Sequence, residues 1–161
     1  MESNNLNSIT FEIKGEPMGK QRPKFSRVGN FVKTYTPKET INYEQWVKAC
    51  YLSAGGRHYG SQAMKIEVHI YYKIPKAYSK KKTQQALDGT IVPTIKPDCD
   101  NVLKIICDSL NGIAYDDDKQ IACVLIQKHY STEPSVVVTL GAKTQNKLIH
   151  TLKANDAIIK Q

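Results

Sequence analysis

The sequence lacks any apolar run near the ~18 residues that a membrane-spanning helix needs. Its first ten residues, MESNNLNSIT, contain no apolar core, so we expect neither a signal peptide nor a membrane span. No C-x-x-C pair is present, which argues against a zinc site and favours free thiols in a reducing cytoplasm. Repeats and domain-sized linkers are also absent, and 161 residues suit one domain. The cysteines are Cys50, Cys99, Cys107 and Cys123.

Acidic residues are scarce except in one segment. The formal net charge is +8, which favours a polyanionic partner such as nucleic acid. Residues 98–118 nevertheless hold six acids and one base, inside a chain that is basic on both sides. Such an acidic island is either a solvated loop or a metal site that must approach a polyanion. Carboxylates alone would repel phosphates, so the second reading requires divalent cations.

Hydrophobic periodicity predicts an α+β fold. Apolar alternation predicts strands, and apolar residues three and four positions apart predict helices. We expect a two-layer sandwich of a mixed β-sheet (about four strands) with two main helices, as a single domain over residues 1–140. Residues 141–161 are expected to be a C-terminal extension with a helical apolar pattern and no assigned role. The predicted strands cover residues 9–13, 65–72, 121–130 and 135–140, the last two as a hairpin; the predicted helices cover residues 37–54, 81–87 and 98–110.

The helix over residues 37–54 carries its own start signal. Thr36 is a good N-cap, Pro37 fits the first helical position, and Glu39 completes a capping box with Thr36. Trp46 falls among the apolar residues at helical spacing, so we expect it in the core.

The helix that begins near Asp98 has one polar and one apolar face. Asp100 and Asp108 each lie four residues from Lys104, within reach of an ion pair. This pattern alone fits a solvated amphipathic helix as well as it fits an active site. The polar arc of the helical wheel contains Asp100, Asn101, Lys104, Asp108 and Asn111.

Two further features favour a metal site. Asp98 and Asp100 lie two apart at the helix entry, where one turn can direct both toward a cation. A second acidic cluster, residues 116–118, leads directly into the strand that starts at Ile121. Magnesium takes oxygen ligands and keeps several waters, so a few carboxylates gathered from these two segments suffice. Neither acidic stretch has the order of an EF-hand loop.

The run KPDCDNVLKIICDSLNGIAYDDDKQI closely resembles the signature of the RusA family of Holliday junction resolvases. The family pairs D-x-D-N-x-x-K-x-x-x-D with a later D-D-x-Q element, and GEPMGKQRPKF resembles its G-x-P-x-x-K-x-R-P element. The resemblance covers roughly residues 9–140. It implies that the metal-binding catalytic carboxylates are Asp98, Asp100 and Asp118, that the essential lysine is Lys104, that Asp117 is an alternative ligand, and that Asn101 and Asp108 are supporting residues.

The resemblance also implies an activity. It predicts a magnesium-dependent crossover junction endodeoxyribonuclease, bacterial or phage-encoded, that tolerates manganese and uses no nucleotide cofactor. A homodimer would place two sites on a four-way junction and resolve it by paired symmetric nicks in DNA recombination and repair. The alternative from another class is a non-catalytic junction-binding protein whose acidic helix is structural. Metal dependence separates the two, because a pure binder needs no magnesium.

Two basic segments, residues 20–33 and residues 73–82, are expected to neutralise DNA phosphates and to make binding sensitive to salt. The first lies within residues 15–35, which are predicted to form a long basic loop or an irregular hairpin. Phe25 or Phe31 in it is a candidate to stack on bases at an open junction centre, although loop aromatics more often pack on their own domain. The predicted DNA-binding residues are Lys20, Arg22, Lys24, Arg27, Lys33, Lys80, Lys81 and Lys82.

Overall fold

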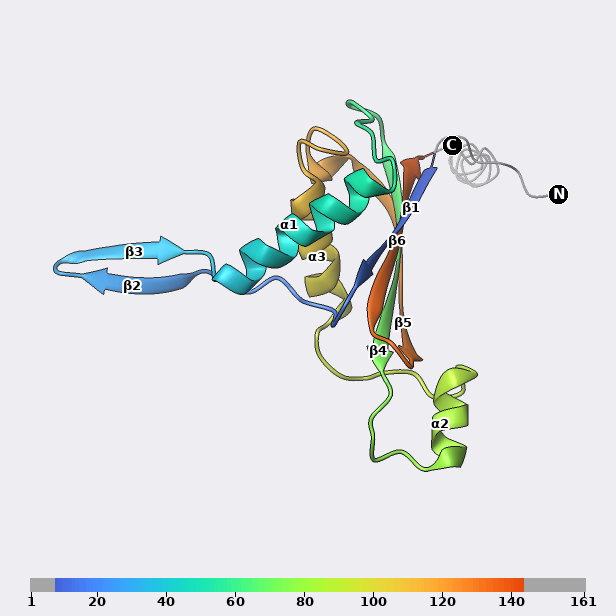
Figure 1. The fold of residues 1–161 in the computed structure, drawn as a ribbon. Coiled ribbons are helices and arrows are strands. Elements are labelled where there is room, and N and C mark those ends of the chain that lie inside the picture. The colour runs from blue at the N-terminus through green and yellow to red at the C-terminus, as the bar shows by residue number, and fades with distance from the viewer. Residues whose placement is uncertain (1–7, 144–161) are drawn as a thin grey trace, which may run out of the picture.

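The apolar patterns of the chain form a four-stranded sheet with two helices on one of its faces (Figure 1). A computed structural model describes residues 8–143. It has the predicted α+β fold, with a mixed sheet in a single domain and a third, short helix. The elements are β1 (Ser8–Lys14), β2 (Lys24–Val28), β3 (Phe31–Tyr35), α1 (Lys38–Ser53), β4 (Met64–Lys73), α2 (Lys80–Leu87), α3 (Cys99–Leu110), a 3-10 turn (Asp118–Gln120), β5 (Ile121–Ser131) and β6 (Ser135–Ala142).

The strand order of the sheet is β1-β6-β4-β5. β4 pairs in parallel with β5 and antiparallel with β6, which in turn pairs antiparallel with β1. The predicted hairpin between residues 121–130 and 135–140 is therefore wrong, because β4 lies between β5 and β6. Strands two positions apart are separated by roughly 10 Å. The short connection from Ser131 to Ser135 is long enough to cross the end of β4.

β4 is one of the two inner strands of the sheet, and its inward face is fully apolar. Met64, Ile66, Val68 and Ile70 have no solvent exposure, and the residues between them point to the open face of the sheet. From the helical side, α3 contributes a buried stripe that includes Ile105. Full burial of one such side chain stabilises the fold by roughly 1.5–3 kcal/mol. The apolar arc of α3 faces this core, so its acidic arc is left toward solvent, as the wheel predicts.

Two expectations for α1 are wrong. The helix starts at Lys38 with Pro37 as its N-cap and without a side-chain cap, so the capping box of Thr36 and Glu39 does not form. Trp46 is 47% exposed and donates its indole N–H to the carbonyl oxygen of Lys14 at 3.1 Å. The buried stripe of α1 runs through Val47 and its neighbours one turn away, which leaves Trp46 at the margin beside β1.

Two elements lie outside the two layers. The basic segment forms a ribbon of β2 and β3 that projects away from α1, and α2 lies beyond one end of the sheet (Figure 1). Of the two forms predicted for the basic segment, a long loop or an irregular hairpin, residues 24–35 adopt the hairpin. None of the helices within residues 8–143 is long and apolar enough to cross a membrane. The tail predicted to be helical lies outside the described residues from residue 144 onward.

Candidate active site

The start of α3, which carries Asp98, is fixed by side chains from two strands. The hydroxyl of Tyr72 donates to the carbonyl oxygen of Pro97 at 2.7 Å, and the ammonium of Lys128 donates to that of Ile95 at 2.7 Å. Burial raises the pKa of Tyr72 to about 12, so its hydroxyl stays protonated at neutral pH. Asp98 occupies the N-cap position, but its side chain accepts no capping hydrogen bond, so its carboxylate is not used by the helix.

A shallow pocket of about 350 Å³ brings three of the predicted catalytic residues together. Asp100 and Lys104 come from α3, one turn apart, and Asp118 comes from the 3-10 turn that precedes β5. The rest of the lining is mainly apolar. Charges that lie over an apolar surface interact more strongly than they would in bulk water. The full lining is Asp100, Leu103, Lys104, Cys107, Asp118, Ile121 and Val124.

The neighbouring carboxylates of Asp117 and Asp118 have different environments. The Asp117 carboxylate caps the 3-10 turn by accepting from the backbone N–H of Lys119 at 3.0 Å, and this bond lowers the pKa of Asp117. Asp118 instead lines the pocket. Partial burial, followed by its contact with Asp117 and the charge of Asp108, raises the pKa of Asp118. Asp118 is therefore the member of the pair that faces the other candidate groups.

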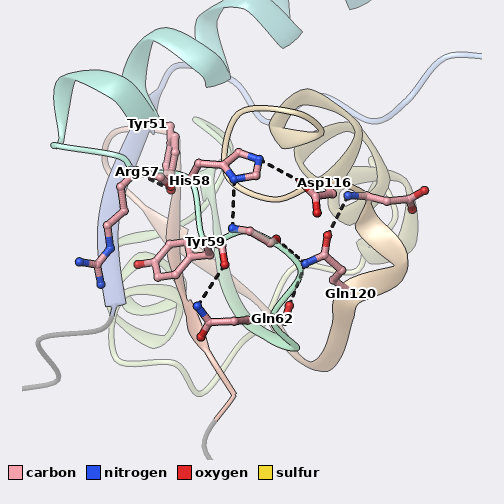
Figure 2. Close-up of polar contacts among 9 residues, drawn as sticks. Tyr51, Arg57, His58, Tyr59, Gln62, Asp116 and Gln120 are labelled. Atoms are coloured by element: carbon pink, nitrogen blue, oxygen red, sulfur yellow. Dashed lines mark hydrogen bonds and ion pairs between the residues drawn. The ribbon is translucent and has the colours of Figure 1, made fainter.

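Gln120 fixes this turn against the loop that follows α1, as Figure 2 shows. Its side-chain nitrogen donates to the carbonyl oxygens of Gly60 and Gln62 at 2.7 and 2.8 Å, while its oxygen accepts from the backbone N–H of Asp117 at 2.9 Å. The position of Asp118 thus depends on an amide two residues away. In the sequence, Gln120 is distinguished only as the last residue of the D-D-x-Q element. Its capping-box spacing from Asp117 is the signal for a positioning role.

The same loop contacts Asp116 through a histidine (Figure 2). Nε2 of His58 lies 3.5 Å from Oδ1 of Asp116, and Nδ1 of His58 accepts from the backbone N–H of Gly60 at 3.0 Å. Asp116 therefore faces the loop after α1, and it is not among the residues that line the pocket.

Asp108 is surrounded by cations. The ammonium of Lys20 lies 3.0 Å from its Oδ2, and that of Lys104 lies 3.9 Å away. Of the two ion pairs predicted for Lys104, this one forms; the structure of residues 8–143 gives none with Asp100. Lys20 also forms an ion pair with Glu44 of α1. Lys20, predicted to bind DNA, therefore neutralises two carboxylates within the domain.

The donor set of the pocket decides whether it can hold a metal ion. Residues 8–143 contain no group of three His, Cys, Asp or Glu side chains that could hold a metal ion. The pocket itself offers two carboxylates, Asp100 and Asp118, while Asp98 and Asp117 are outside its lining. Cys107 is no competing ligand, because burial raises its pKa to about 12 and keeps it a thiol. Two oxygen donors fit magnesium, which keeps several of its waters.

The remaining predicted DNA-binding residues fall into two groups. Lys24, Arg27 and Lys33 are exposed on the β2–β3 ribbon, and Arg22 is exposed just before it. Residues 80–82 are exposed in the first turn of α2. Figure 1 shows the ribbon and α2 on different sides of the domain, so the two groups do not form one continuous patch.

Comparison with known proteins identifies the family. The family model described as endodeoxyribonuclease RusA matches residues 14–141, which include the pocket, the ribbon and the sheet strands β4, β5 and all but the last residue of β6. The chain is also 32% identical over 137 residues to the uncharacterized protein YqaN of Bacillus subtilis (strain 168). That match covers 84% of this chain and 96% of the relative. The chain belongs to the RusA family of endodeoxyribonucleases.

Proposed function

We propose that this protein is a magnesium-dependent endonuclease that hydrolyses phosphodiester bonds in branched DNA, with four-way junctions as its substrate. The observation that carries the proposal is the pocket in which Asp100, Lys104 and Asp118 converge. Its residue types fit phosphodiester hydrolysis, and the family match supports a nuclease. The basic ribbon and α2 supply positive charge for the phosphates of the substrate.

Asp100 and Asp118 would hold the metal, and Asp98, exposed at the entry of α3, would contribute to a second metal position. When bound, magnesium supplies an activated water and neutralises charge on the phosphate. Manganese satisfies the same oxygen donors. Lys104 would provide a positive charge for the phosphate in the transition state. Asp108 restrains Lys104 from one side, and Asn101 braces the segment before the ribbon through its carbonyl oxygen, which accepts from Lys20 N–H at 3.0 Å.

Resolution of a four-way junction needs two cuts, and one chain offers one such pocket. We therefore propose a homodimer that makes paired symmetric nicks, in DNA recombination and repair. A two-fold dimer matches the two-fold symmetry of the junction.

A second candidate function is a non-catalytic junction-binding module. It is favoured by one observation: residues 8–143 hold no preformed group of three metal-binding side chains. The two functions differ in their need for metal. A binder holds junctions equally with magnesium or EDTA and never produces nicks.

The test is cleavage of a panel of branched and linear DNAs with and without magnesium. Asp118→Asn and Asp117→Asn make a matched pair, since each removes one charge from neighbouring residues. We expect Asp118→Asn and Asp100→Asn to lower the nicking rate on the order of a hundredfold. Asp117→Asn should retain most of the rate, because asparagine also caps helical turns. No magnesium-dependent nicking by the wild type, or equal rates for Asp118→Asn and wild type, would overturn the proposal.

A further inference from the structure

The β2–β3 ribbon presents large apolar side chains directly to solvent. Phe31 is 81% exposed, Phe25 73% and Val28 67%. The strands are joined by Gly29 and Asn30, and Gly29 has the positive φ of 62° that a type II′ hairpin turn requires at its first position. A two-stranded ribbon is marginally stable by itself in water. Apolar side chains this exposed therefore indicate a surface that functions in contact with a partner.

The pairing register separates the two phenylalanines. Residues directly opposite each other in an antiparallel pair share a face, and Val28 is opposite Phe31 next to the turn. This face continues toward the root of the ribbon with Lys33 and then Lys24. Phe25 points to the other face. One face thus has an apolar tip at Val28 and Phe31, followed by the two lysines. Phe25 lies on the other face, so its substitution can serve as a control for that of Phe31.

The root of the ribbon is attached to the helix that carries the candidate carboxylates. The backbone N–H of Lys20 donates to the carbonyl oxygen of Asn101 at 3.0 Å. Gly19 packs so closely that a Cβ there would lie 3.0 Å from the Cβ of Asn101 and 3.1 Å from that of Pro97. The ribbon therefore has a fixed starting point beside the entry of α3. Its five-residue strands carry the tip roughly 17 Å beyond the start of β2 at Lys24.

The charges of this segment identify the kind of partner. Residues 21–35 contain four cations and no carboxylate, and three of the cations are on the ribbon. A purely apolar contact with a second copy of the chain would leave these charges unmatched, whereas a nucleic acid matches them. Two-stranded ribbons fit the major groove of DNA. Apolar side chains of DNA-binding proteins insert between base steps, at a cost that is smallest where stacking is already broken.

We propose that the ribbon binds branched DNA with Val28 and Phe31 inserted between unstacked bases at the branch point. Lys24, Arg27 and Lys33 contact the flanking phosphates. The inference rests on the proposed function only in its choice of branched DNA as the substrate. It adds a means of selecting that substrate, because intact duplex offers no open step at which the tip enters without unstacking.

Phe31→Ala and Phe25→Ala test the proposal as a matched pair on the same ribbon. The probe is a synthetic four-way junction with 2-aminopurine at the branch point, titrated in EDTA so that no hydrolysis occurs. We expect the wild type and Phe25→Ala to change the fluorescence alike. Phe31→Ala should reduce that change at least fivefold and weaken junction binding about tenfold. Val28→Ser should act in the same direction, and circular dichroism checks that each variant is folded.

Equal responses of Phe31→Ala and Phe25→Ala would overturn the assignment of the tip, as would a wild type that does not bind the junction. Light scattering covers the alternative partner: conversion of a dimer to a monomer by Phe31→Ala would make the tip a subunit contact and overturn the proposal. The readout needs no metal. A protein that shows the expected fluorescence but no nicking with magnesium would refute the proposed nuclease function and leave the inference about the ribbon standing.

Discussion

The ammonium of Lys20 lies 3.0 Å from Oδ2 of Asp108, so a residue in the segment before β2 neutralises a carboxylate on α3. Because Lys20 also pairs with Glu44, one cation connects α1 to α3. Partial burial opposes the charge, but hydrogen bonds to Glu44 and Asp108 outweigh it and raise the pKa of Lys20. A raised lysine pKa stabilises the fold at every pH below the ordinary value of 10.5, and this contribution is lost above it.

Lys20→Met should destabilise the protein, because it leaves the two partly buried carboxylates of Glu44 and Asp108 without their shared cation. We expect the free energy of unfolding to fall by about 1–3 kcal/mol. Urea unfolding at pH 7 measures the change. Lys24→Met is the matched control, since Lys24 is exposed on the ribbon and should shift stability by less than about 0.5 kcal/mol. Equal midpoints for the two variants would contradict the structural role of Lys20.

Gln120→Glu should disturb the turn that carries Asp118. Glutamate keeps the size of the side chain but replaces the nitrogen that donates to the carbonyl oxygens of Gly60 and Gln62. We expect a loss of about 1–3 kcal/mol of stability from the two unpaired acceptors. We also expect a higher magnesium concentration for half-maximal nicking, because Asp118 moves. Gln127→Glu, an exposed change on β5, is the control for added charge.

A magnesium requirement that stays unchanged in Gln120→Glu, despite lower stability, would reduce Gln120 to a purely structural residue. A higher magnesium requirement, with the maximal nicking rate of Gln120→Glu recovered once enough magnesium is added, would support a positioning role for Gln120.

The sequence predicts the parts of this structure that depend on local pattern. The strict alternation in β4 and the one-sided apolar arc of α3 each follow from the repeat of one element, and both are confirmed. The order of strands depends on which strand competes best for the centre of the sheet. The strands on either side of residues 132–134 are predicted, but nothing local shows that the connection between them crosses over the end of β4.

The candidate site divides in the same way. The spacing of Asp100 and Lys104 is enough to predict that they share one face of a helix. The structure adds that the 3-10 turn with Asp118 lies beside this face, so that all three residues line one pocket. The contacts of Lys20 with Asp108 and of Gln120 with Gly60 join distant segments, and no periodicity encodes them. A basic residue in a basic segment is most simply interpreted as a phosphate contact, which is why the internal pairing of Lys20 was missed.

His129 predicts a pH dependence of stability on the open face of the sheet. Its Nε2 lies 2.9 Å from Nδ1 of His69, whose Nε2 lies 2.9 Å from Oε1 of Glu67, and Tyr71 stacks on the His129 ring. Burial, followed by the charge of His69, lowers the pKa of His129. The unfolded chain therefore binds the proton more readily, and stability should fall as the pH drops below the ordinary value of 6.5.

His129→Gln should remove that part of the dependence while keeping a polar partner for His69. Urea unfolding of both proteins between pH 8 and pH 5 measures it. The difference in stability between wild type and variant should shrink toward acid pH. Parallel curves over this range would show that His129 does not contribute.

Lys104→Met should slow the chemical step without weakening substrate binding. The side chain of Lys104 is 61% exposed and lies at the mouth of the pocket, while Asp108 restrains it at 3.9 Å. A positive group that acts on the transition state changes kcat more than KM, so we expect kcat to fall about 10²- to 10³-fold and KM to change little.

Lys119→Met is the matched control: Lys119 is also exposed and also lies near an aspartate, Asp117 at 3.5 Å, yet it does not line the pocket. Initial nicking rates measured over a range of four-way junction concentrations give the two constants. A loss confined to KM would make Lys104 a phosphate-binding residue instead, and equal losses in both variants would attribute the effect to net charge.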